Sequence, residues 1–438
     1  MKLSGWGRYP RINAKVNSPL TIIELKKIIK KKSIARGNGR SYGDSSISKS
    51  STICMKKFNN ILEFDKKTGL LVVESGVLLS DIIDRFLPKG WFPKVTPGSK
   101  YVSVGGMVAC DVHGKNHHKD GSFGKYIKWL EIITTNGKVK RCSKKNNSKL
   151  FNWTIGGMGL TGVILSVAFY LRPIKTSWIK QKTIPTNNID HTIEIFEKNL
   201  NSTYSVAWID CLSQGSGLGR SLVMLGEHAQ ILDLDTKKRK NPLLLKKKKN
   251  LSLPFDFPSF VLNSFTIKMF NFFYYFFNSK NLKSKLVYYD TFFYPLDYIV
   301  NWNRIYGHKG FAQFQCVIPI KNASSGIREL LELISKFKST SFLTVLKRFG
   351  KQNSFVSFPM KGYTLALDFP ITKKNLGLMK QLDKITLKYK GRFYLAKDSR
   401  LKKNDLKKSD SRFKKFSKFR ATNMKKQFSS SQSERLGL

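Results

Sequence analysis

Three glycine-dense segments in the first 175 residues constrain the fold of this 438-residue chain more than any other feature of its sequence. They are ARGNGRSYGDS at residues 35–45, PGSKYVSVGG at residues 97–106 and GGMGLTG at residues 156–162. Glycine adopts positive φ without strain and lets successive backbone N–H groups converge into a concavity that binds anions. Because a simple turn needs only one glycine, the three segments together predict a phosphate-binding site suited to a pyrophosphate.

The third segment contains a formal GxGxxG pattern at Gly157, Gly159 and Gly162. In a Rossmann fold this pattern follows a strand and opens a helix. Here the order is reversed, because a helix-like stretch at residues 148–155 precedes it and a strand-like stretch at residues 163–171 follows it. The sequence therefore excludes Rossmann-type cofactor binding.

Apolar periodicity predicts an α+β organisation for the first 175 residues. Helices are predicted at residues 21–32 and 78–87, and strands at residues 70–75, 130–135 and 163–171. In the last of these strands, alternation predicts that one face carries Val163, Leu165, Val167, Phe169 and Leu171.

From about residue 176 glycines become rarer, and strand-like and helix-like stretches alternate. Strands are predicted at residues 317–319, 344–347 and 363–369, and helices at residues 327–337 and 376–389. This alternation predicts an α/β sheet covered on one side by helices.

Two stretches of the chain are more basic than the rest. A basic and aromatic insertion occupies residues 237–285, and a Lys- and Ser-rich tail occupies residues 402–438. In the tail, Phe413, Phe416 and Phe419 recur every three residues, which suits either a surface helix or a loose tail.

The composition is strongly basic, with 79 Lys and Arg against 28 Asp and Glu and a formal net charge of +51. Such a charge favours anionic partners, namely nucleic acid, an acidic lipid surface or a phosphorylated substrate. Part of it is equally consistent with compositional drift on a solvated surface. With 41% hydrophobic residues the chain can bury substantial cores, which excludes disorder for most of it.

The cysteines and the hydropathy indicate the compartment. Five cysteines without a CxxC pair argue against a disulfide framework or a zinc ribbon and favour a reducing compartment. The N-terminus lacks the apolar core of a secretory signal, and no stretch of uncharged apolar residues is long enough to span a membrane. We therefore expect a cytoplasmic protein.

Three of the six histidines, His113, His117 and His118, fall in one segment, CDVHGKNHHKDGSFG at residues 110–124. No carboxylate or thiolate lies at helical spacing from them, and Gly114 and Gly121 interrupt any rigid helix, so we expect no metal site. The alternatives are a loop that lines a ligand site and a solvated loop.

These segments carry a family resemblance. GWGRYP, GNGRSYGDS, PGSKYVSVGG, ACDVHGKNHHKDGSFG and FNWTIGGMGLTG occur in the order typical of FAD-linked oxidases of the vanillyl-alcohol oxidase and p-cresol methylhydroxylase (PCMH) type. The resemblance continues through YPLD, FAQFQCVIP, LKRFG, LALDFP and YLAKDSR, and so covers nearly the whole chain. Within this family the chain resembles the decaprenylphosphoryl-β-D-ribose oxidases.

The resemblance implies an α+β, two-domain PCMH-type flavoprotein. Its FAD-binding domain would occupy residues 1–175, its α/β substrate or cap domain residues 176–390 with the insertion 237–285, and its C-terminal return to the FAD domain residues 391–438.

The resemblance also implies which residues contact FAD. They are Ala35, Arg36, Gly37, Asn38, Gly39, Arg40, Ser41, Tyr42, Gly43, Asp44, Ser45, Gly98, Ser103, Val104, Gly105, Gly106, Cys110, Asp111, Val112, His113, Ile164 and Tyr394. Many relatives attach FAD covalently through a histidine in the first glycine segment. Because Arg40 stands at that position here, we expect noncovalent FAD.

The catalytic residues implied by the resemblance are Lys397, Tyr42 and His113. Lys397 would lie beside the flavin and the substrate, where a cation stabilises developing negative charge or polarises the substrate hydroxyl. The substrate side of the site would be lined by Gln313, Gln315, Lys347 and Lys397.

The implied reaction oxidises a sugar hydroxyl to a ketone by hydride transfer to flavin N5. The implied substrate is a polyprenyl-phosphoryl pentose, and the reaction would be the first half of an epimerisation in cell-wall biosynthesis. A separate NAD(P)-dependent short-chain reductase would complete the epimerisation. The alternatives are a soluble aldonolactone or sugar-alcohol oxidase and, from another class, a basic nucleic-acid-binding protein, for which no recognition motif is present.

The basic stretches fit the same substrate. In the insertion, lysines at residues 246–249 precede dense Phe and Tyr, a combination that favours peripheral binding to an anionic membrane. We expect the insertion and the basic tail at the inner face of the cell membrane, where a lipid-linked sugar is accessible. The alternative is that the insertion only forms a flap over the active site.

Overall fold

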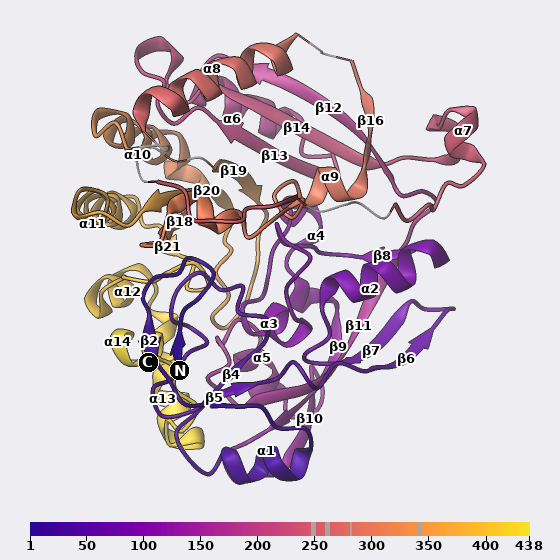
Figure 1. Cartoon of the computed structure of the whole chain (residues 1–438), viewed down its shortest axis with the longest axis vertical. Coiled ribbons are helices and arrows are strands. Elements are labelled where there is room, and N and C mark those ends of the chain that lie inside the picture. Colours follow the sequence, from indigo (N-terminus) through magenta and orange to yellow (C-terminus); the bar gives the residue numbers. More distant parts are fainter. Residues whose placement is uncertain (247–250, 259–262, 281–282, 340, 342) are drawn as a thin grey trace.

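The computed structural model describes residues 1–438 except 247–250, 259–262, 281–282, 340 and 342. Figure 1 shows two domains, an N-terminal domain below and a cap domain above. The chain enters the cap domain after β11 and returns to the N-terminal domain after β21, so that both termini lie on the lower domain.

The N-terminal domain is built around two main sheets. A parallel sheet has the order β3-β5-β4, and a second, antiparallel sheet has the order β10-β9-β11-β7-β6, with β8 paired to the end of β11. The strands are β1 (Lys2–Leu3), β2 (Ile12–Asn13), β3 (Val16–Asn17), β4 (Ile34–Arg36), β5 (Thr52–Cys54), β6 (Ile61–Asp65), β7 (Leu70–Glu74), β8 (Trp91–Pro93), β9 (Ile127–Ile133), β10 (Val139–Ser143) and β11 (Val163–Pro173).

Short helices connect these strands: α1 (Ile22–Ile28), α2 (Leu79–Phe86), α3 (Val104–Ala109), α4 (His117–Asp120) and α5 (Ser148–Thr154). The predicted helix at residues 21–32 begins as expected, with Thr21 accepting a hydrogen bond from the backbone N–H of Glu24. It ends earlier, because the chain must turn into β4. The order α5, glycine segment, β11 confirms that the GxGxxG pattern lies between a helix and a strand, the reverse of a Rossmann motif.

The predicted single apolar face of β11 is wrong. Its pairing with β9 shifts at Leu165, where two residues of β11 oppose one residue of β9, and such a bulge reverses the side-chain alternation. Val163 and Leu165 therefore pack in a cluster with Leu25, whereas Val167 and Phe169 belong to the main core.

The cap domain holds an eight-stranded sheet of order β16-β12-β14-β13-β19-β20-β18-β21. Its pairings are antiparallel. The strands are β12 (Trp178–Thr186), β13 (Tyr204–Ile209), β14 (Ser221–His228), β16 (Lys285–Tyr288), β18 (Phe311–Pro319), β19 (Thr344–Phe349), β20 (Gly362–Pro370) and β21 (Arg392–Phe393).

Helices cover one face of this sheet, as the sequence predicts. They are α6 (Ile189–Lys198), α10 (Ala323–Lys336) and α11 (Lys373–Lys388). In α10 the residues Ile327, Leu330, Leu331 and Ile334 recur at helical spacing and are buried. Because side chains alternate across a strand, the residues of the other face point away from these helices and can line a site against the N-terminal domain.

The insertion is attached to the cap sheet at both ends. It contains α7 (Thr236–Arg239), β15 (Leu251–Ser252) and α8 (Ser264–Ser279) and ends at β16; α9 (Tyr289–Phe293) and β17 (Ile299–Val300), which pairs with β15, follow it. Of the lysines at 246–249, residues 247–249 lie outside the described residues, and Lys246 lies over the ring of Trp178 at 4.7 Å. In the part of the chain that the structure describes, no helix has the length and apolarity needed to cross a membrane.

The C-terminal tail is folded, contrary to the loose-tail alternative. It forms α12 (Lys403–Ser409), α13 (Arg412–Met424) and α14 (Ser431–Leu436) on the N-terminal domain (Figure 1). Phe416 and Phe419 of α13 stack on Trp153 of α5, and the buried guanidinium of Arg420 donates to the backbone oxygen of Leu160. The three-residue spacing of the phenylalanines thus marks the buried face of a surface helix, whose other face exposes Lys414, Lys415 and Lys418.

Candidate active site

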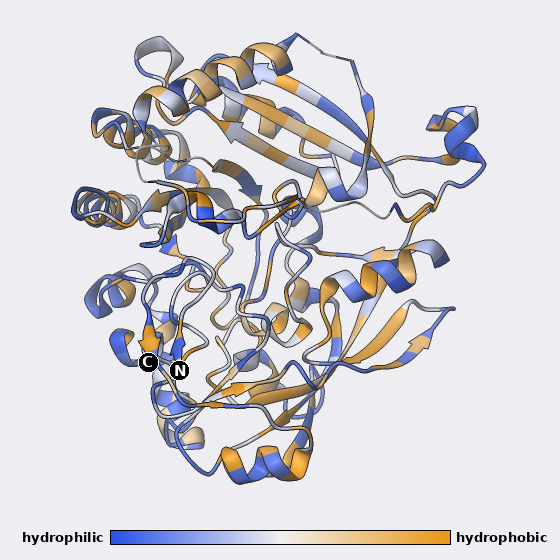
Figure 2. Ribbon diagram, in the orientation of Figure 1, coloured by the Kyte–Doolittle hydropathy of each residue, from blue (hydrophilic) through white to orange (hydrophobic). Residues whose placement is uncertain are grey.

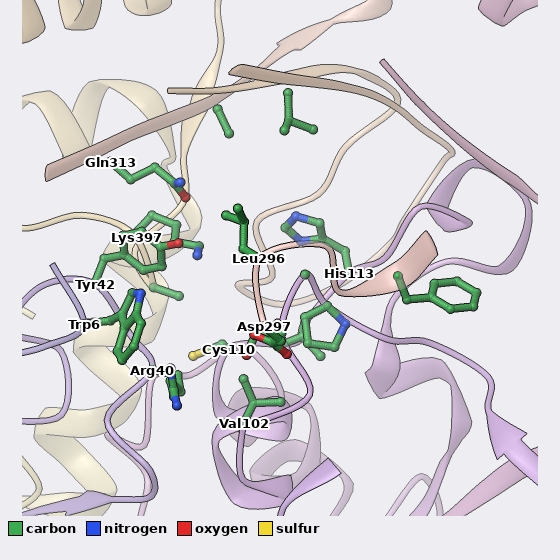
Figure 3. Close-up of a pocket in the computed structure, with 18 of the residues that line it drawn as sticks. Trp6, Arg40, Tyr42, Val102, Cys110, His113, Leu296, Asp297, Gln313 and Lys397 are labelled. Carbon is green, nitrogen blue, oxygen red and sulfur yellow. The ribbon is translucent and has the colours of Figure 1, made fainter. Parts of the chain in front are cut away.

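A cavity of about 550 Å³ lies between the two domains (Figure 3). All three glycine segments line it. The N-terminal domain contributes the first two segments and, from the third, Met158, Gly159 and Gly162. The cap domain contributes β12, β13, β14, β18, β19 and β20, together with Tyr274 and Asn278 of α8. Segments that lie about 60 residues apart in the sequence therefore form one site.

Glycine is required where the first two segments meet. A Cβ on Gly37 would collide with the side chain of Ser103, and Gly39 has φ of 67°. Next to them, Asn38 Nδ2 donates to the backbone oxygen of Tyr101 at 2.8 Å. The close approach of these two backbones gives the cavity its glycine-lined floor.

Most of the predicted site residues line this cavity. From the predicted cofactor contacts these are Ala35, Gly37, Asn38, Gly39, Arg40, Ser41, Tyr42, Ser45, Gly98, Ser103, Gly105, Gly106, Cys110, Val112, His113, Ile164 and Tyr394, and from the substrate side Gln313, Gln315, Lys347 and Lys397. The predicted residues outside this lining are Arg36, Gly43, Asp44, Val104 and Asp111.

Gly43 and Asp44 hold the first glycine segment against the C-terminal return. A Cβ on Gly43 would collide with the backbone oxygen of Asp398, so only glycine allows this approach. Asp44 is buried and accepts from Arg435 Nη2 at 2.8 Å, and the same nitrogen lies 2.9 Å from Asp398 Oδ2. Their role in this structure is to position the loop.

Arg36, Val104 and Asp111 also support the lining from behind. Arg36 Nη2 donates to the backbone oxygen of Ser4 at 2.7 Å, and Val104 is fully buried. Asp111 accepts from Ser122 Oγ at 2.7 Å and from the backbone N–H of Gly124 at 2.8 Å. These contacts fix the backbone on which the cavity residues stand.

The three predicted catalytic residues lie on two sides of the cavity. Figure 3 shows Lys397 and Tyr42 together on one side and His113 on the other. The Lys397 ammonium nitrogen lies 3.4 Å from the centre of the Tyr42 ring. A hydrogen bond of 3.0 Å from the backbone N–H of Tyr42 to Ala396 O fixes the two loops that carry them.

His113 is a buried neutral side chain. Its ring lies 4.7 Å from the ring of Phe349 and 5.0 Å from that of Tyr394, and its Nε2 lies 3.3 Å from Gln315 Nε2. Burial, followed by the charge of Lys347, holds the pKa of His113 well below its ordinary value. His113 therefore acts at neutral pH as a hydrogen-bonding group and not as a cation.

The other two histidines of that segment are used in packing. His117 Nε2 lies 2.7 Å from Gln352 Oε1, and His118 Nε2 lies 2.7 Å from the backbone oxygen of Ser202. The ligand-loop interpretation therefore applies to His113, which lines the cavity, and not to the whole segment.

Lysines gather on the substrate side. Lys115, Lys347 and Lys397 are half-buried cavity residues. Burial lowers the pKa of Lys115 to about 7 and that of Lys347 to about 8, and the charge of Lys347 adds to the first shift. Burial also lowers the pKa of Lys397, although the charge of Asp368 opposes this. Cations so close together in a desolvated site favour an anionic ligand.

Several cavity residues were missed by the sequence reasoning. These are Trp6, Lys115, Trp208, Tyr274, Asn278, Leu296, Asp297 and Trp302. Trp6 stands in GWGRYP, Lys115 in CDVHGKNHH, and Leu296 and Asp297 in YPLD, so the motifs were recognised without these side chains being assigned. Trp208, Tyr274 and Asn278 carry no local signal, since only the folding of the cap brings them to the cavity.

Comparison with known proteins identifies the family. Residues 12–143 match the FAD binding domain family. Over 411 residues the chain is 36% identical to decaprenylphosphoryl-β-D-ribose oxidase of Mycolicibacterium smegmatis, which covers 91% of this chain and 89% of that enzyme. This protein belongs to the FAD-linked oxidases of the PCMH type. It is therefore an FAD-dependent oxidoreductase with the α+β two-domain fold of that family.

Shorter similarities reach other oxidoreductases. The chain is 27% identical over 150 residues to L-gulonolactone oxidase of Bos taurus, covering 34% of this chain and 33% of that enzyme. It is 30% identical over 146 residues to D-lactate dehydrogenase of Anaerostipes hadrus, covering 32% of this chain and 30% of that enzyme.

The cavity fits FAD. A Cβ on Gly98 would meet no atom within 4 Å, so the backbone there faces open space that a ligand can fill. Ser75 Oγ and His113 Nδ1 are buried without a hydrogen-bond partner among the described residues, and both residues line the cavity. The backbone of residues 37–41 would hold the pyrophosphate.

Gly98 allows a test of this site that spares the fold. A valine side chain at Gly98 would extend into the cavity without meeting protein atoms, so Gly98→Val should fold normally but retain little FAD. Flavin absorbance per polypeptide after gel filtration, together with the melting temperature, measures both effects. Gly377→Val is the matched control, because a Cβ on Gly377 of α11 also meets no atom within 4 Å but lies outside the cavity lining. Full flavin content in Gly98→Val would contradict this placement of the cofactor.

Proposed function

We propose that this enzyme oxidises a hydroxyl group of a polyprenyl-phosphoryl pentose to a ketone, as the first half of an epimerisation. The observation that carries this proposal is the set of half-buried lysines Lys115, Lys347 and Lys397 beside the amides Gln313 and Gln315, in one cavity. The lysines suit a phosphodiester, and the amides suit sugar hydroxyls.

The cavity residues have separable roles in this reaction. FAD, held by the glycine-lined side of the cavity, would supply the acceptor for the hydride of the carbon that carries the hydroxyl group. Lys397 stabilises the negative charge that develops as the hydroxyl proton leaves. Gln313 and Gln315 orient the sugar, and Lys115 and Lys347 hold the phosphate.

The proposal includes noncovalent FAD. The guanidinium of Arg40 stacks over the ring of Trp6 at 3.9 Å, and an arginine at this position offers no nucleophile for attachment. Cys110, a thiol in the cavity lining, has its pKa raised to about 11 by burial, so it is not a thiolate at neutral pH.

Noncovalent binding predicts complete release of the flavin. Acid precipitation or detergent denaturation of the purified yellow protein should leave all of the FAD in the supernatant, because no bond retains it. Absorbance of the supernatant and mass spectrometry of the intact chain check this outcome. A polypeptide mass increased by that of FAD would contradict it.

Anaerobic flavin reduction tests the substrate class. Polyprenyl-phosphoryl ribose should bleach the flavin rapidly, whereas free ribose and aldonolactones should not, because they lack the phosphate that the lysines would bind. Stopped-flow absorbance at the flavin band follows the reaction. Bleaching by lactones or free sugars alone would instead support a soluble lactone oxidase, which the similarity to L-gulonolactone oxidase favours.

Salt-sensitive DNA binding without flavin would support the remaining alternative, a nucleic-acid-binding protein.

In the same assay, Lys397→Ala should retain FAD but lose most of its flavin reduction, by about 10²–10³-fold, which is typical for loss of one charge-stabilising group. Near-normal reduction by this variant would show that Lys397 is not catalytic.

The proposed location is the inner face of the cell membrane, with α8 as the contact. One face of α8 is turned to the protein: Ile267 and Asn271 are buried, and Tyr274 and Asn278, at helical spacing from them, line the cavity. Asn271 Nδ2 donates to Asp210 Oδ1 at 2.7 Å. The contacts of this face fit the alternative that the insertion forms a flap over the active site.

Figure 2 colours much of the α8 ribbon as hydrophobic, and large apolar side chains on the helix face turned away from the protein are exposed. These side chains are exposed by 39–69%, namely Phe265, Met269, Phe270, Phe272, Phe273, Phe276 and Phe277. Lys268 of α8 and Lys280, which caps its C-terminal end, are exposed, and Lys280 lies 3.9 Å above the Phe276 ring. Aromatic side chains beside lysines favour the interface of an anionic bilayer. A lipid-linked sugar would then reach the cavity beneath the same helix.

Replacing Phe272, Phe276 and Phe277 by Gln should weaken binding to vesicles of phosphatidylglycerol and phosphatidylcholine more than about tenfold, since burying one phenylalanine contributes about 1.5–3 kcal/mol. Vesicle sedimentation measures the effect, and flavin content should not change. The matched control replaces Ile23, Leu62 and Leu232 by Gln, side chains that are exposed by 54–84% elsewhere on the molecule. Equal weakening in both triple variants would refute a specific role for α8.

The reaction partner follows from the product. A ketone at the pentose ring is returned to a hydroxyl of opposite configuration by a hydride donor, so we propose a separate NAD(P)-dependent short-chain reductase as the pathway partner. The five cysteines are free thiols, which agrees with the reducing cytoplasm as the compartment of both enzymes.

A further inference from the structure

Asp368 is a buried carboxylate beside the substrate side of the cavity, on the same face of the cap sheet as Gln313. It lies on β20 opposite Gln313 of β18, and it is fully buried. Its Oδ1 accepts a hydrogen bond from Gln313 Nε2, and its backbone N–H donates to Ser341 Oγ at 3.0 Å. Among the described residues its Oδ2 has no hydrogen-bond partner. Burying a carboxylate oxygen without a hydrogen-bond partner costs stability, so its presence in a folded protein calls for an explanation such as a catalytic role.

The charged and titratable groups that face Asp368 come from three other elements. They are Lys397 after β21, Tyr42 in the first glycine segment, and Tyr306 in the 3₁₀ turn Trp302–Tyr306. Burial and then the charge of Asp368 raise the pKa of both tyrosines, so the two phenols stay neutral. Lys397 is therefore the group that can exchange a proton with Asp368.

The surroundings bring the proton affinities of this acid and this base together. Burial raises the pKa of Asp368, although Gln313 and Lys397 oppose the shift. Burial lowers the pKa of Lys397, Asp368 opposes the shift, and the charge of Lys347 adds to it. Ordinary aspartate and lysine differ by about 6 pKa units, so a proton does not normally move between them. Here the difference is reduced from both sides.

We propose that Asp368 is a positioning residue that takes up, through Lys397, the proton that leaves the substrate hydroxyl. Oxidation of an H–C–O–H group breaks one C–H and one O–H bond. The hydride leaves with the C–H electron pair for the cofactor, and the O–H pair forms the second carbon–oxygen bond. The proton moves to Lys397 Nζ while another Nζ proton moves to the Asp368 carboxylate.

After this transfer of protons from the substrate to Lys397 and from Lys397 to Asp368, each side chain is in a protonation state that its surroundings stabilise. Lys397 remains an ammonium ion beside the reacting atoms, and Asp368 becomes a neutral acid, the form that burial stabilises. In the structure the ammonium rests on the Tyr42 ring, so transfer to Asp368 proceeds through rotation of the flexible lysine stem or one bridging water. The inference rests on the proposed function for the identity of the alcohol, but any alcohol that this site oxidises releases the same proton.

The test compares pH profiles of flavin reduction by an alcohol substrate. In the wild type the rate should fall as the pH is lowered, because protonated Asp368 no longer accepts a proton. Asp368→Asn should be about 10²–10³-fold slower and should lose the wild-type midpoint, since general-base catalysis contributes about this much. Asp368→Glu should restore part of the rate and a pH dependence with a shifted midpoint. Tyr306→Phe, the matched control, should keep the wild-type profile, because Tyr306 lies outside the cavity lining.

A second measurement does not depend on turnover. Infrared difference spectra of the substrate-free holoprotein between acid and alkaline pH should contain a carboxylic acid band that is missing in Asp368→Asn. Its midpoint should lie between the ordinary pKa values of aspartate, about 4, and lysine, about 10.

The outcomes separate the two proposals. An Asp368→Asn enzyme with the wild-type rate and profile, or a wild-type spectrum without this band, would overturn the role of Asp368. If Asp368→Asn does not retain FAD, the Asp368→Glu enzyme decides: a pH–rate midpoint equal to that of the wild type would overturn the role of Asp368. A wild-type rate that does not vary with pH would also overturn this role, and it would leave the proposed function intact. A wild-type flavin that no polyprenyl-phosphoryl pentose reduces would refute the proposed function, and the infrared band would still decide the role of Asp368.

Discussion

The contact of Gly43 with the C-terminal segment is the constraint on which the active site depends. The absence of a side chain lets the backbone of the first glycine segment touch the backbone oxygen of Asp398, and Arg435 binds the carboxylates of Asp44 and Asp398 on either side. Removing one partner of such a buried ion pair costs about 3–5 kcal/mol, because a charge is left unpaired. Through this contact Tyr42 and Lys397, which are 355 residues apart in sequence, lie side by side.

The cap sheet supplies the chemistry of the opposite wall. Its strands are antiparallel and carry helices on one face, so every second residue of β18, β19 and β20 faces the cavity. This alternation places Gln313, Gln315 and Lys347 in the lining, and it places Asp368 on the same face of the sheet, beside Gln313 and next to the lining residues. Desolvation by the two domains then lowers the pKa of the cavity lysines and raises that of Asp368. Closing the cap on the N-terminal domain thus creates both the cavity and its unusual acid–base properties.

The basic charge of the chain is not concentrated on one surface. In Figure 1 the helix α8 lies at the top of the cap domain, whereas the basic helix α13 packs on the N-terminal domain in the lower part of the molecule and α12 lies between them, against α11 and β21. The two basic stretches therefore do not form one membrane face. The proposal of membrane contact rests on α8, where exposed phenylalanines accompany the lysines, and much of the remaining charge is solvated surface.

The sequence by itself determined the family, the glycine-lined cofactor site and the type of most elements, because glycine spacing and apolar periodicity are local properties. It predicted α2 and β7 almost to the residue, and it placed Lys397, Gln313 and Gln315 through family motifs. It missed the bulge in β11, it left open whether the C-terminal tail is a helix or loose, and it did not reveal Asp368, Arg435 or Tyr274 as parts of the site. Only the tertiary structure decided these features, because each depends on contacts between segments far apart in the chain, and burial, which sets the pKa of a side chain, is a property of the folded molecule alone.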